Sequence, residues 1–350
     1  MKQRKKKKKR VLRQVFARFL QLTAPKRTSG IPFTGKLRSI AILAQEKLGD
    51  SVLLTPLLKN LRIQYPKLAI HIITFSQSSF DFFCCDPNVT AVHQVKKNPL
   101  NYFKEVLTHR FDLLFNTKDH PSTHFLLQSA LIRARYKVGH ACEFHEGLFD
   151  HLIAIPFHSH MAMKNCALLT LFGSHPPNDQ CRPSLPPMPV SDAIVMFLQK
   201  IAVKTIIGIN LSAGEMNRQW LEKSWEELLQ LYSDETFIVL SGPEGREEKQ
   251  RIETRFSNVL ASPSTQNIYE AGLIIATVKL LITPDTSLIH VASCYDIPVI
   301  GLYREAPQDL SRFGPLFIPF ELIISATGEV SDISVTAVAE KVQLLAKKVE

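Results

Sequence analysis

The sequence lacks the features of membrane-spanning and disulfide-stabilised proteins. No run of about 18 apolar residues occurs among the 350 positions, so no helix is expected to cross a bilayer. The six cysteines include no C-x-x-C pair, so we expect neither a disulfide framework nor a zinc site. This cysteine usage predicts a reducing, cytosolic compartment. Apolar residues make up 45% and charged residues 21%, which excludes wholesale disorder and suits two globular domains.

Acidic residues are missing from the first 30 positions, which hold twelve Lys or Arg. The net charge of +10 therefore leaves about −2 for the rest of the chain. Behind a lysine run, apolar residues recur at helical spacing: Val11, Val15, Phe16, Phe19, Leu20 and Leu22. This pattern favours a basic amphipathic helix on an anionic membrane surface, with nucleic acid or a solvated extension as alternatives. We expect residues 1–36 to form a tail and linker, and we expect deletion of residues 1–30 to leave a folded enzyme.

From residue 37 the pattern alternates between strands and helices, which predicts parallel sheets covered by helices. Strands are expected at 39–44, 69–75, 89–95, 111–116, 133–140, 205–211, 236–242, 279–285 and 298–304. Helices are expected at 51–64, 99–109, 191–202, 224–232, 244–257 and 267–278. Six prolines within 174–190 mark a linker. We therefore expect an α/β protein with two doubly wound, Rossmann-like domains, at 37–185 and 186–333, facing each other across a cleft. A last helix, 334–350, could pack back on the first domain.

The first candidate functional segment surrounds Asp50. Asp50 follows Gly49 where a predicted strand turns into a helix, so its carboxylate should face the crevice at the strand ends. An Asp at this place is also a common helix N-cap, and the two roles are compatible.

The second segment follows the strand that ends at residue 211. Ser212, Ala213 and Gly214 are small and expose backbone N–H groups, and Arg218 follows them. Backbone donors with a guanidinium form a phosphate cradle, although the Walker A pattern is absent. The alternative is an ordinary loop with a surface arginine.

The third segment begins a helix at a strand end with Asp285, Thr286 and Ser287, and His290 follows one turn later. Free N–H groups there suit a diphosphate. An N-cap with a buried core histidine is the alternative, and for the bare pattern the more common one. His120/His124, His140/His145 and His158/His160 could pair as ligands, but no set of metal ligands is completed, so we expect no metal.

Together these segments resemble glycosyltransferase family 9, the ADP-heptose:lipopolysaccharide heptosyltransferases. Its G-D-x-x-x-x-T-P motif is matched by Gly49-Asp50 and Thr55-Pro56. The motif H/N-P-G-A-S-x-x-x-K-x-W is matched in register by Asn210, Ala213, Arg218 and Trp220. The motif D-T-G-x-x-H-x-A-A is matched by Asp285, Thr286, Ser287, His290 and Ala292, and the segment after the last strand by Arg312-Phe313-Gly314-Pro315. The chain departs from the family at Arg218 (usually Lys), Ser287 (Gly), Leu211-Ser212 (Pro-Gly) and Ala44 (often Arg).

The resemblance implies a GT-B arrangement of two Rossmann-like domains. The N-terminal domain would bind a lipid-linked saccharide acceptor and the C-terminal domain a nucleotide sugar, with transfer inverting the anomeric centre and requiring no metal and no cofactor. Asp50 would act as general base, and Arg218 with the N–H groups near Gly214, Thr286 and Ser287 would stabilise the leaving diphosphate.

The resemblance also implies sets of binding residues. The candidates for the nucleotide sugar are Ser212, Ala213, Gly214, Arg218, Glu244, Glu247, Gln266, Asp285, Thr286, Ser287 and His290, with the ribose contact open between the two glutamates. The candidates for the acceptor are Lys47, Gly49, Arg62 and Lys118. We expect heptose transfer from ADP-heptose to the lipopolysaccharide or lipooligosaccharide inner core, at the cytoplasmic face of a bacterial inner membrane and without nucleic acid. The alternatives are another nucleotide sugar, or a non-catalytic, membrane-associated binding protein on the same fold.

Overall fold

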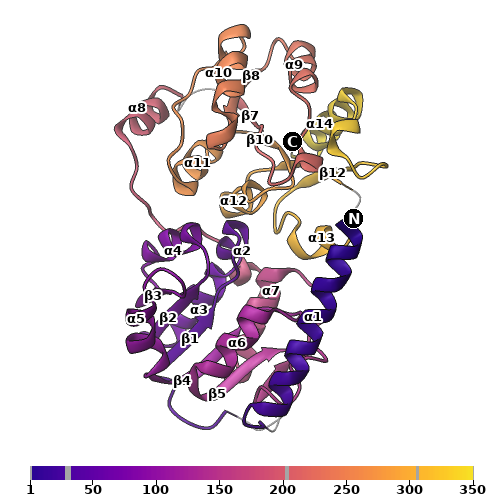
Figure 1. Cartoon of the computed structure of the whole chain (residues 1–350). Helices are drawn as coiled ribbons and strands as arrows, with labels where there is room; N and C mark the ends of the chain where they lie inside the picture. Colours follow the sequence, from indigo (N-terminus) through magenta and orange to yellow (C-terminus); the bar gives the residue numbers. More distant parts are fainter. Residues whose placement is uncertain (1, 28–32, 202–204, 305–306, 350) are drawn as a thin grey trace. The chain divides into compact units, whose positions relative to one another are not determined.

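The computed structural model describes residues 2–27, 33–201, 205–304 and 307–349 (Figure 1). The chain divides into two compact units, Met1–Cys181 and Arg182–Glu350, so the division falls shortly before the expected boundary at 185. Each unit contains one six-stranded sheet in which all neighbouring strands are parallel, with helices on both faces. The expected α/β class is confirmed.

The sheet of the first unit has the strand order β3-β2-β1-β4-β5-β6. Its strands are β1 (Ser39–Leu43), β2 (Ala69–Thr74), β3 (Ala91–Gln94), β4 (Arg110–Asn116), β5 (Arg133–His140) and β6 (His151–Ile153). Its helices are α1 (Lys2–Thr23), α2 (Leu48–Val52), α3 (Thr55–Gln64), α4 (Gln77–Cys84), α5 (Pro99–Tyr102), the π-helix η1 (Phe103–Leu107), α6 (Thr123–Leu131), α7 (Met161–Cys166), and the 3₁₀ helices η2 (Ala167–Phe172) and η3 (Asn178–Cys181). The strand order reverses between β1 and β4, and at such a switch point the connections leave in opposite directions and open a crevice at the carboxyl ends of the strands.

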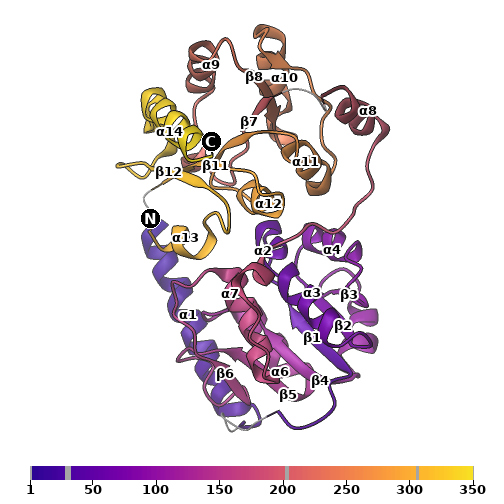
Figure 2. The ribbon, with the colours of Figure 1, turned by 180° about the vertical axis from the view of Figure 1, so that it is seen from behind.

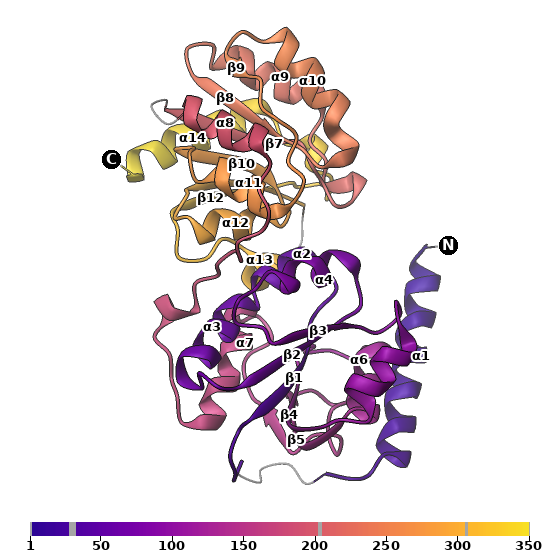
Figure 3. The ribbon, with the colours of Figure 1, turned by 90° about the vertical axis from the view of Figure 1, so that its left-hand side faces the viewer.

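The two faces of this sheet carry different helices. Tyr102 and Val106 share a core with Phe125 and with strand residues, so α5, η1 and α6 cover one face. Figure 3 shows α6 and α1 on one side of the sheet and α3 and α7 on the other, and Figure 2 looks onto α3 and α7. This is the arrangement expected when right-handed crossovers run outward in both directions from β1.

Helix α1 belongs to the first unit and corrects the expectation of a separable tail. Ala17 and Leu20 are buried against Leu126, Phe144 and other residues of this unit. Gln21 anchors the same helix by donating hydrogen bonds to the carbonyl oxygens of Glu143 and Glu146, both at 3.1 Å. Of the six apolar residues in the pattern, Leu20 is buried in the protein and Phe16 is partly buried, while the other four are exposed. The amphipathic pattern by itself did not distinguish these packed residues from residues available to a membrane.

The helix expected at 51–64 is two helices, α2 and α3. Pro56 lies in the first turn of α3, and proline has no N–H to donate to the carbonyl of Val52. The Thr55 hydroxyl donates to that carbonyl instead, at 2.8 Å. The chain therefore starts a second helix instead of continuing the first.

The second unit repeats the topology of the first, with the strand order β12-β11-β10-β7-β8-β9. Its strands are β7 (Ile206–Asn210), β8 (Thr236–Leu240), β9 (Val259–Leu260), β10 (Leu280–Pro284), β11 (Val299–Tyr303) and β12 (Phe320–Ile324). Its helices are α8 (Asp192–Ile201), η4 (Met216–Arg218), α9 (Glu222–Leu231), η5 (Pro243–Gly245), α10 (Arg246–Arg255), α11 (Ile268–Ile275), α12 (Leu288–Cys294), α13 (Pro307–Phe313), η6 (Val330–Asp332) and α14 (Val335–Val349). Here the strand order reverses between β7 and β10.

The core of the second unit includes the C-terminal helix α14. Val338, Val342 and Leu345 are buried in one cluster with Trp220 and Trp225. The Tyr232 hydroxyl also donates a hydrogen bond of 3.2 Å to the carbonyl of Ala339. The helix that could have packed back on the N-terminal domain thus places its apolar face in the C-terminal unit, in the same cluster as residues of α9 and α10.

Candidate functional site

Asp50 lies at the switch point of the first sheet. It occupies the first turn of α2, directly after β1, and is half-buried. The N-cap position of α2 is Lys47, not Asp50, and the Lys47 backbone N–H donates to the Asp50 carboxylate. The carboxylate therefore helps to close the start of the helix from inside its first turn. This position lets Asp50 support the helix and still line the crevice.

The surroundings of Asp50 adjust its basicity in two directions. Burial raises the pKa of Asp50 above its ordinary value, because a charged carboxylate is poorly solvated there. The positive charges of Lys118 and Lys47 lower the pKa, whereas Glu46 raises it. The net result is a carboxylate with a raised pKa, which is a property of general bases.

Lys118 follows β4, the strand next to β1, and is mostly buried. Its ammonium group donates to Gln45 Oε1 at 2.9 Å, lies 3.3 Å from Glu46 Oε2 and lies 5.2 Å from the ring centre of Phe125. These contacts fix the cation near Asp50, so the structure brings together Asp50, Lys47, Gly49 and Lys118 at one strand edge.

A small hollow beside Asp50 contains residues that sequence reasoning missed. Its lining consists of Gln45, Asp50, Leu53, Leu54, Thr117, Met161 and Asn165. Asn165 is buried, and its amide nitrogen donates to the carbonyl of Leu53 at 2.9 Å. Within the described structure its Oδ1 has no hydrogen-bond partner, so the hollow contains a free acceptor. Gln45 and Thr117 follow strands at the switch point and could have been found by that rule, but Asn165 lies on α7 and gave no signal.

Arg62 does not join this site. It lies at the carboxyl end of α3, and its guanidinium donates to the carbonyls of Pro66 and Asn88, both at 2.7 Å. Because α3 starts near the carboxyl edge of the sheet and returns towards its amino edge, a residue at its end lies away from Asp50. Arg62 instead ties together the loops that precede β2 and β3.

In the second unit, Asn210 connects the two strands of the switch point. Its buried amide nitrogen donates to Thr283 Oγ1 at 2.9 Å and to Thr286 Oγ1 at 3.2 Å. Its Oδ1 accepts from the Ser212 backbone N–H at 3.0 Å. One side chain therefore holds the loop after β7 against the loop after β10, which brings the second and third candidate segments together.

Arg218 and Asp285 form the charged centre of this second site. Arg218 Nη1 lies 2.7 Å from Asp285 Oδ2 and 3.3 Å from the Asp285 carbonyl, and about an eighth of each side chain is exposed. Gly214 is exposed, and a Cβ built on it would meet no atom within 4 Å. The loop after β7 thus combines an open backbone with a fixed guanidinium, which is a suitable combination for binding a phosphate group.

The start of α12 supplies further polar groups. The Thr286 hydroxyl accepts from the Leu288 backbone N–H at 3.3 Å, and Ser287 is the N-cap residue, without a side-chain cap hydrogen bond. His290 is buried, with 6% of its surface exposed. Thr286 and Ser287 therefore border the site, and His290, within α12, is buried.

The remaining nucleotide-site candidates differ in position. The Ser212 hydroxyl accepts from the Gly242 backbone N–H, which places Glu244, two residues later, next to the loop after β7. Glu247 instead borders a surface hollow between α9 and α10 with Glu222 and Arg251. Of the two glutamates, only Glu244 is connected to the cradle.

Gln266 is exposed, and its backbone N–H donates to Glu270 Oε2. Glu270 is fully buried and also accepts from the Ser191 backbone N–H at 2.7 Å. Arg304, which follows β11, lies 3.2 Å from Glu215 in the loop after β7. Among the described residues, no three His, Cys, Asp or Glu side chains are grouped as metal ligands.

Comparisons with known proteins identify the family. Residues 100–341 match glycosyltransferase family 9 (heptosyltransferase), and residues 8–166 also match a family of unknown function. The lipopolysaccharide core heptosyltransferase OpsX of Haemophilus influenzae is 24% identical over 287 residues, which cover 77% of this chain and 80% of OpsX.

Solved structures show the same fold. A family 9 glycosyltransferase from Veillonella parvula has a TM-score of 0.68 at 16% identity and covers 89% of this chain and 97% of its own. The E. coli heptosyltransferase WaaC, solved with ADP, has a TM-score of 0.65 at 17% identity and covers 89% of this chain and 98% of its own. Since the family match spans more than half of the chain, the chain belongs to glycosyltransferase family 9, the heptosyltransferases, and is a glycosyltransferase with a GT-B fold.

Proposed function

We propose that this enzyme transfers a heptose from ADP-heptose to the inner core of lipopolysaccharide or lipooligosaccharide, with inversion at the anomeric carbon. The observation that carries the proposal is that each sheet has polar groups of the required chemistry at its switch point. The first has a carboxylate whose pKa is raised, and the second has a guanidinium beside an open backbone loop. The names of OpsX and WaaC support the choice of heptose, lipopolysaccharide core and ADP.

In the proposed reaction, Asp50 accepts the proton of an acceptor hydroxyl while that oxygen attacks the anomeric carbon of the donor. The bond from this carbon to the diphosphate breaks, and ADP leaves with the electron pair. A single in-line displacement inverts the anomeric centre. The charges of Lys118 and Lys47 partly offset the rise in the pKa of Asp50 that its burial causes. Lys47, Gly49 and Lys118 are the proposed acceptor contacts.

On the donor side, Arg218 stabilises the negative charge that develops on the diphosphate as it leaves. Asp285 holds the guanidinium at the end of β10, so Arg218 needs little rearrangement to meet a phosphate oxygen. The N–H groups near Gly214 and those near Thr286 and Ser287 add donors. Glu244 is the proposed ribose contact, because the Ser212–Gly242 hydrogen bond brings its loop to the cradle. We propose that this positive charge and these donors make a bound metal unnecessary.

We also propose that the enzyme works at the cytoplasmic face of a bacterial inner membrane. None of the described helices is long and apolar enough to span a bilayer. The first ten residues contain eight Lys or Arg, and α1 exposes Val11, Leu12, Val15, Phe19 and Leu22. Cationic residues next to an apolar helix face suit an anionic membrane, where a lipid-linked acceptor would lie.

The experiment is a transfer assay with the purified full-length protein. ADP-heptose and a panel of other nucleotide sugars are offered with lipopolysaccharide core precursors, and the products are analysed by mass and anomeric configuration. We expect heptose transfer with inversion, unchanged by EDTA. Transfer of a different sugar would support the alternative donor, and nucleotide binding without transfer to any precursor would support a non-catalytic binding protein.

A further inference from the structure

The exposed apolar residues of the first unit gather on one layer of helices. Among its described residues, eleven large apolar side chains are exposed, and all but Ile63 and Phe157 lie on α1, α5, η1 or α6. The residues on these helices are Val11, Leu12, Val15, Phe19, Leu22, Leu100, Phe103, Leu127 and Leu131. Helices α3 and α4, on the opposite face of the sheet, expose only Ile63 among their described large apolar residues.

These helices form one continuous layer. The Tyr102 hydroxyl of α5 donates to Gln128 Oε1 of α6 at 2.5 Å, which joins the first two helices. Leu126 of α6 packs against Ala17 and Leu20, which joins α6 to α1. Figure 3 shows α6 and α1 on the same side of the sheet. Apolar residues separated by about 80 positions in the sequence thus belong to one outer surface, here called the α5–α6–α1 surface.

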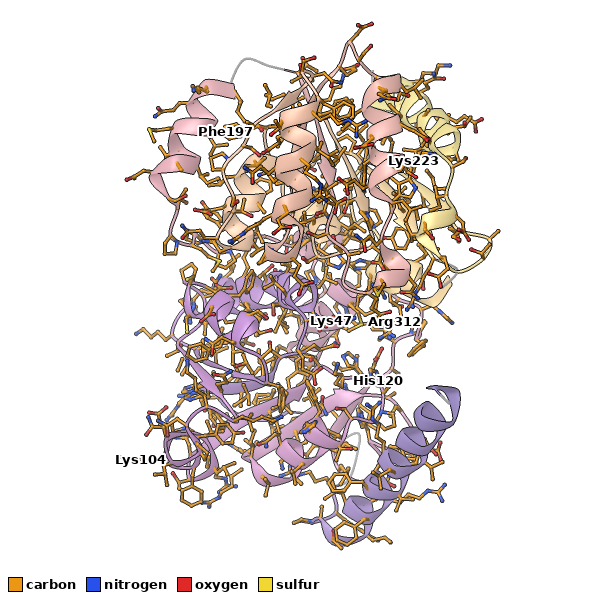
Figure 4. The ribbon with its side chains drawn as sticks, turned by 45° about the horizontal axis from the view of Figure 1, so that its top comes forward. Lys47, Lys104, His120, Phe197, Lys223 and Arg312 are labelled. Carbon is orange, nitrogen blue, oxygen red and sulfur yellow. The ribbon has the colours of Figure 1, made fainter. Side chains whose placement is uncertain are left out.

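The charge of this surface is mainly positive. The exposed basic residues on or beside its helices include Arg13, Arg18, Lys96 and Lys104. The sequence adds eight Lys or Arg among its first ten residues. Figure 4 shows Lys104 at the outside of the first unit. Two of the nearby acidic groups have cationic or titratable neighbours, since Glu105 lies 3.2 Å from His93 Nδ1 and Glu143 lies 3.8 Å from Arg18.

We propose that the whole α5–α6–α1 surface, and not the N-terminal segment alone, is the side on which the first unit rests against an anionic bilayer. This inference rests on the proposed function, in which the acceptor is a lipid. Leu100 and Phe103 lie beside Lys96 and Lys104, so apolar side chains can enter the headgroup region while the ammonium groups meet lipid phosphates. A folded nucleic acid would leave these apolar side chains without a partner, which favours lipid.

The packing of α1 distinguishes this surface from a flexible anchor. Ala17 and Leu20 are already buried in the protein, so the helix is formed and held before it meets the membrane. Binding then involves a prepared surface with two separate apolar areas, on α1 and on α5 with η1. The orientation of the first unit on the membrane follows from the engagement of both areas.

The test uses the full-length enzyme and two double variants. The variant Leu100→Ser with Phe103→Ser removes the apolar residues of α5 and η1, and Val15→Ser with Phe19→Ser removes those of α1. Ile63→Ser, which changes a similarly exposed residue on the opposite face, is the matched control. Co-sedimentation is measured with vesicles of phosphatidylcholine alone and with added phosphatidylglycerol, at low and high salt, and folding is checked by circular dichroism.

We expect each double variant to bind anionic vesicles about tenfold more weakly, because two partly inserted side chains are lost, while the control binds like the wild type. Wild-type binding by the Leu100/Phe103 variant together with weak binding by the Val15/Phe19 variant would overturn the inference and leave the N-terminal segment as the anchor. Dissociation of an oligomer in place of a loss of vesicle binding would identify the surface as an interface between copies and also overturn it. Activity on detergent-dispersed acceptor tests the proposed function separately, because neither area contains a residue of the site.

Discussion

At the residue scale, Asp50 and Arg218 occupy equivalent positions, each at the switch point of its own sheet, but their environments differ. Burial raises the pKa of Asp50 while the charges of Lys118 and Lys47 lower it, whereas Arg218 is held by a direct ion pair with Asp285. A base needs affinity for a proton, and a phosphate ligand needs a permanent charge in a fixed place. The contacts of each residue suit its proposed role.

Replacing Asp50 with Asn should remove the base while preserving the size of the side chain. Loss of a general base commonly lowers the rate by about 10²–10⁴. We expect turnover to fall by this order, while ADP binding and the thermal midpoint stay near their wild-type values. Asp81→Asn, at an exposed position on α4, is the control. Normal turnover in the Asp50→Asn enzyme would remove Asp50 from the mechanism.

Arg218→Ala should weaken ADP binding and slow transfer, each by about 10- to 100-fold, because a charge-assisted hydrogen bond to the diphosphate is lost. Arg218→Lys should recover part of both, since the charge is retained without the fork of two donors. Isothermal titration with ADP and initial rates measure the two effects. Arg251→Ala, on the outer face of α10, is the control. Equal ADP affinity in wild type and Arg218→Ala would show that the cradle lies elsewhere.

His145 should make the first unit sensitive to acid. Burial lowers its pKa to about 4, so the folded state binds fewer protons than the unfolded state, in which the pKa is near 6.5. The stability is therefore complete above pH 6.5 and decreases as the pH falls from 6.5 towards about 4. The free energy of unfolding, followed by far-UV circular dichroism, should fall less steeply in His145→Gln than in wild type. The same slope in both would refute this assignment, and the exposed His124, changed to Gln, is the control.

At the element scale, helix α1 both packs against its own unit and exposes apolar residues, and one amphipathic pattern contains the residues for both. One side of the helix, with Ala17 and Leu20, completes the packing of α6, and another side, with Val15 and Phe19, stays exposed. Basic amphipathic helices are typical of membrane surfaces, but the spacing of apolar residues does not tell which of them the protein itself covers. The contacts with α6 decide this.

Leu20→Ala should therefore destabilise the first unit by about 2–3 kcal/mol, because a buried side chain is truncated. Leu22→Ala, at a residue with 82% of its surface exposed, should change stability by no more than about 0.5 kcal/mol. Far-UV circular dichroism reports on both units, whereas the two tryptophans, Trp220 and Trp225, report only on the second. If Leu20→Ala lowers the unfolding midpoint seen by tryptophan fluorescence but leaves the circular dichroism signal of the first unit unchanged, the packing of α1 in the first unit is contradicted.

At the scale of the whole molecule, each unit has its own sheet and its own core, so each should fold alone. We expect fragments 1–181 and 182–350 to give cooperative unfolding transitions, because α1 completes the first core and α14 the second. The 182–350 fragment should bind ADP with an affinity close to that of the full chain, and neither fragment should transfer sugar alone. Circular dichroism, calorimetry with ADP and the transfer assay check this. An aggregated or unfolded 182–350 fragment would show that the second unit depends on the first.

The sequence alone determined the alternation of strands and helices, the α/β class and the places of Asp50, Arg218 and Asp285. These depend on local signals: apolar runs of strand length, and polar residues in the segments that follow them. Short strands such as β9 (Val259–Leu260) were not recognised as strands, because a two-residue strand has no periodicity. The break between α2 and α3 was missed, although Pro56 marks it, because the apolar spacing continues across the proline.

Which distant residues meet depends on the tertiary structure. Asn165 comes to the hollow beside Asp50 from α7, more than 100 residues away, and Arg62 is carried away from that hollow by the direction of α3. In the same way, α14 packs into the core of the second unit, and one side of α1 packs against the first unit. A sequence pattern records that a side chain is apolar or charged, whereas its partner depends on the strand order of the sheet and on the direction in which each helix leaves it. For this chain, the sequence therefore predicted the chemical type of the residues near each strand end. It did not predict which residues make up the site or which residues of α1 are buried and which are exposed.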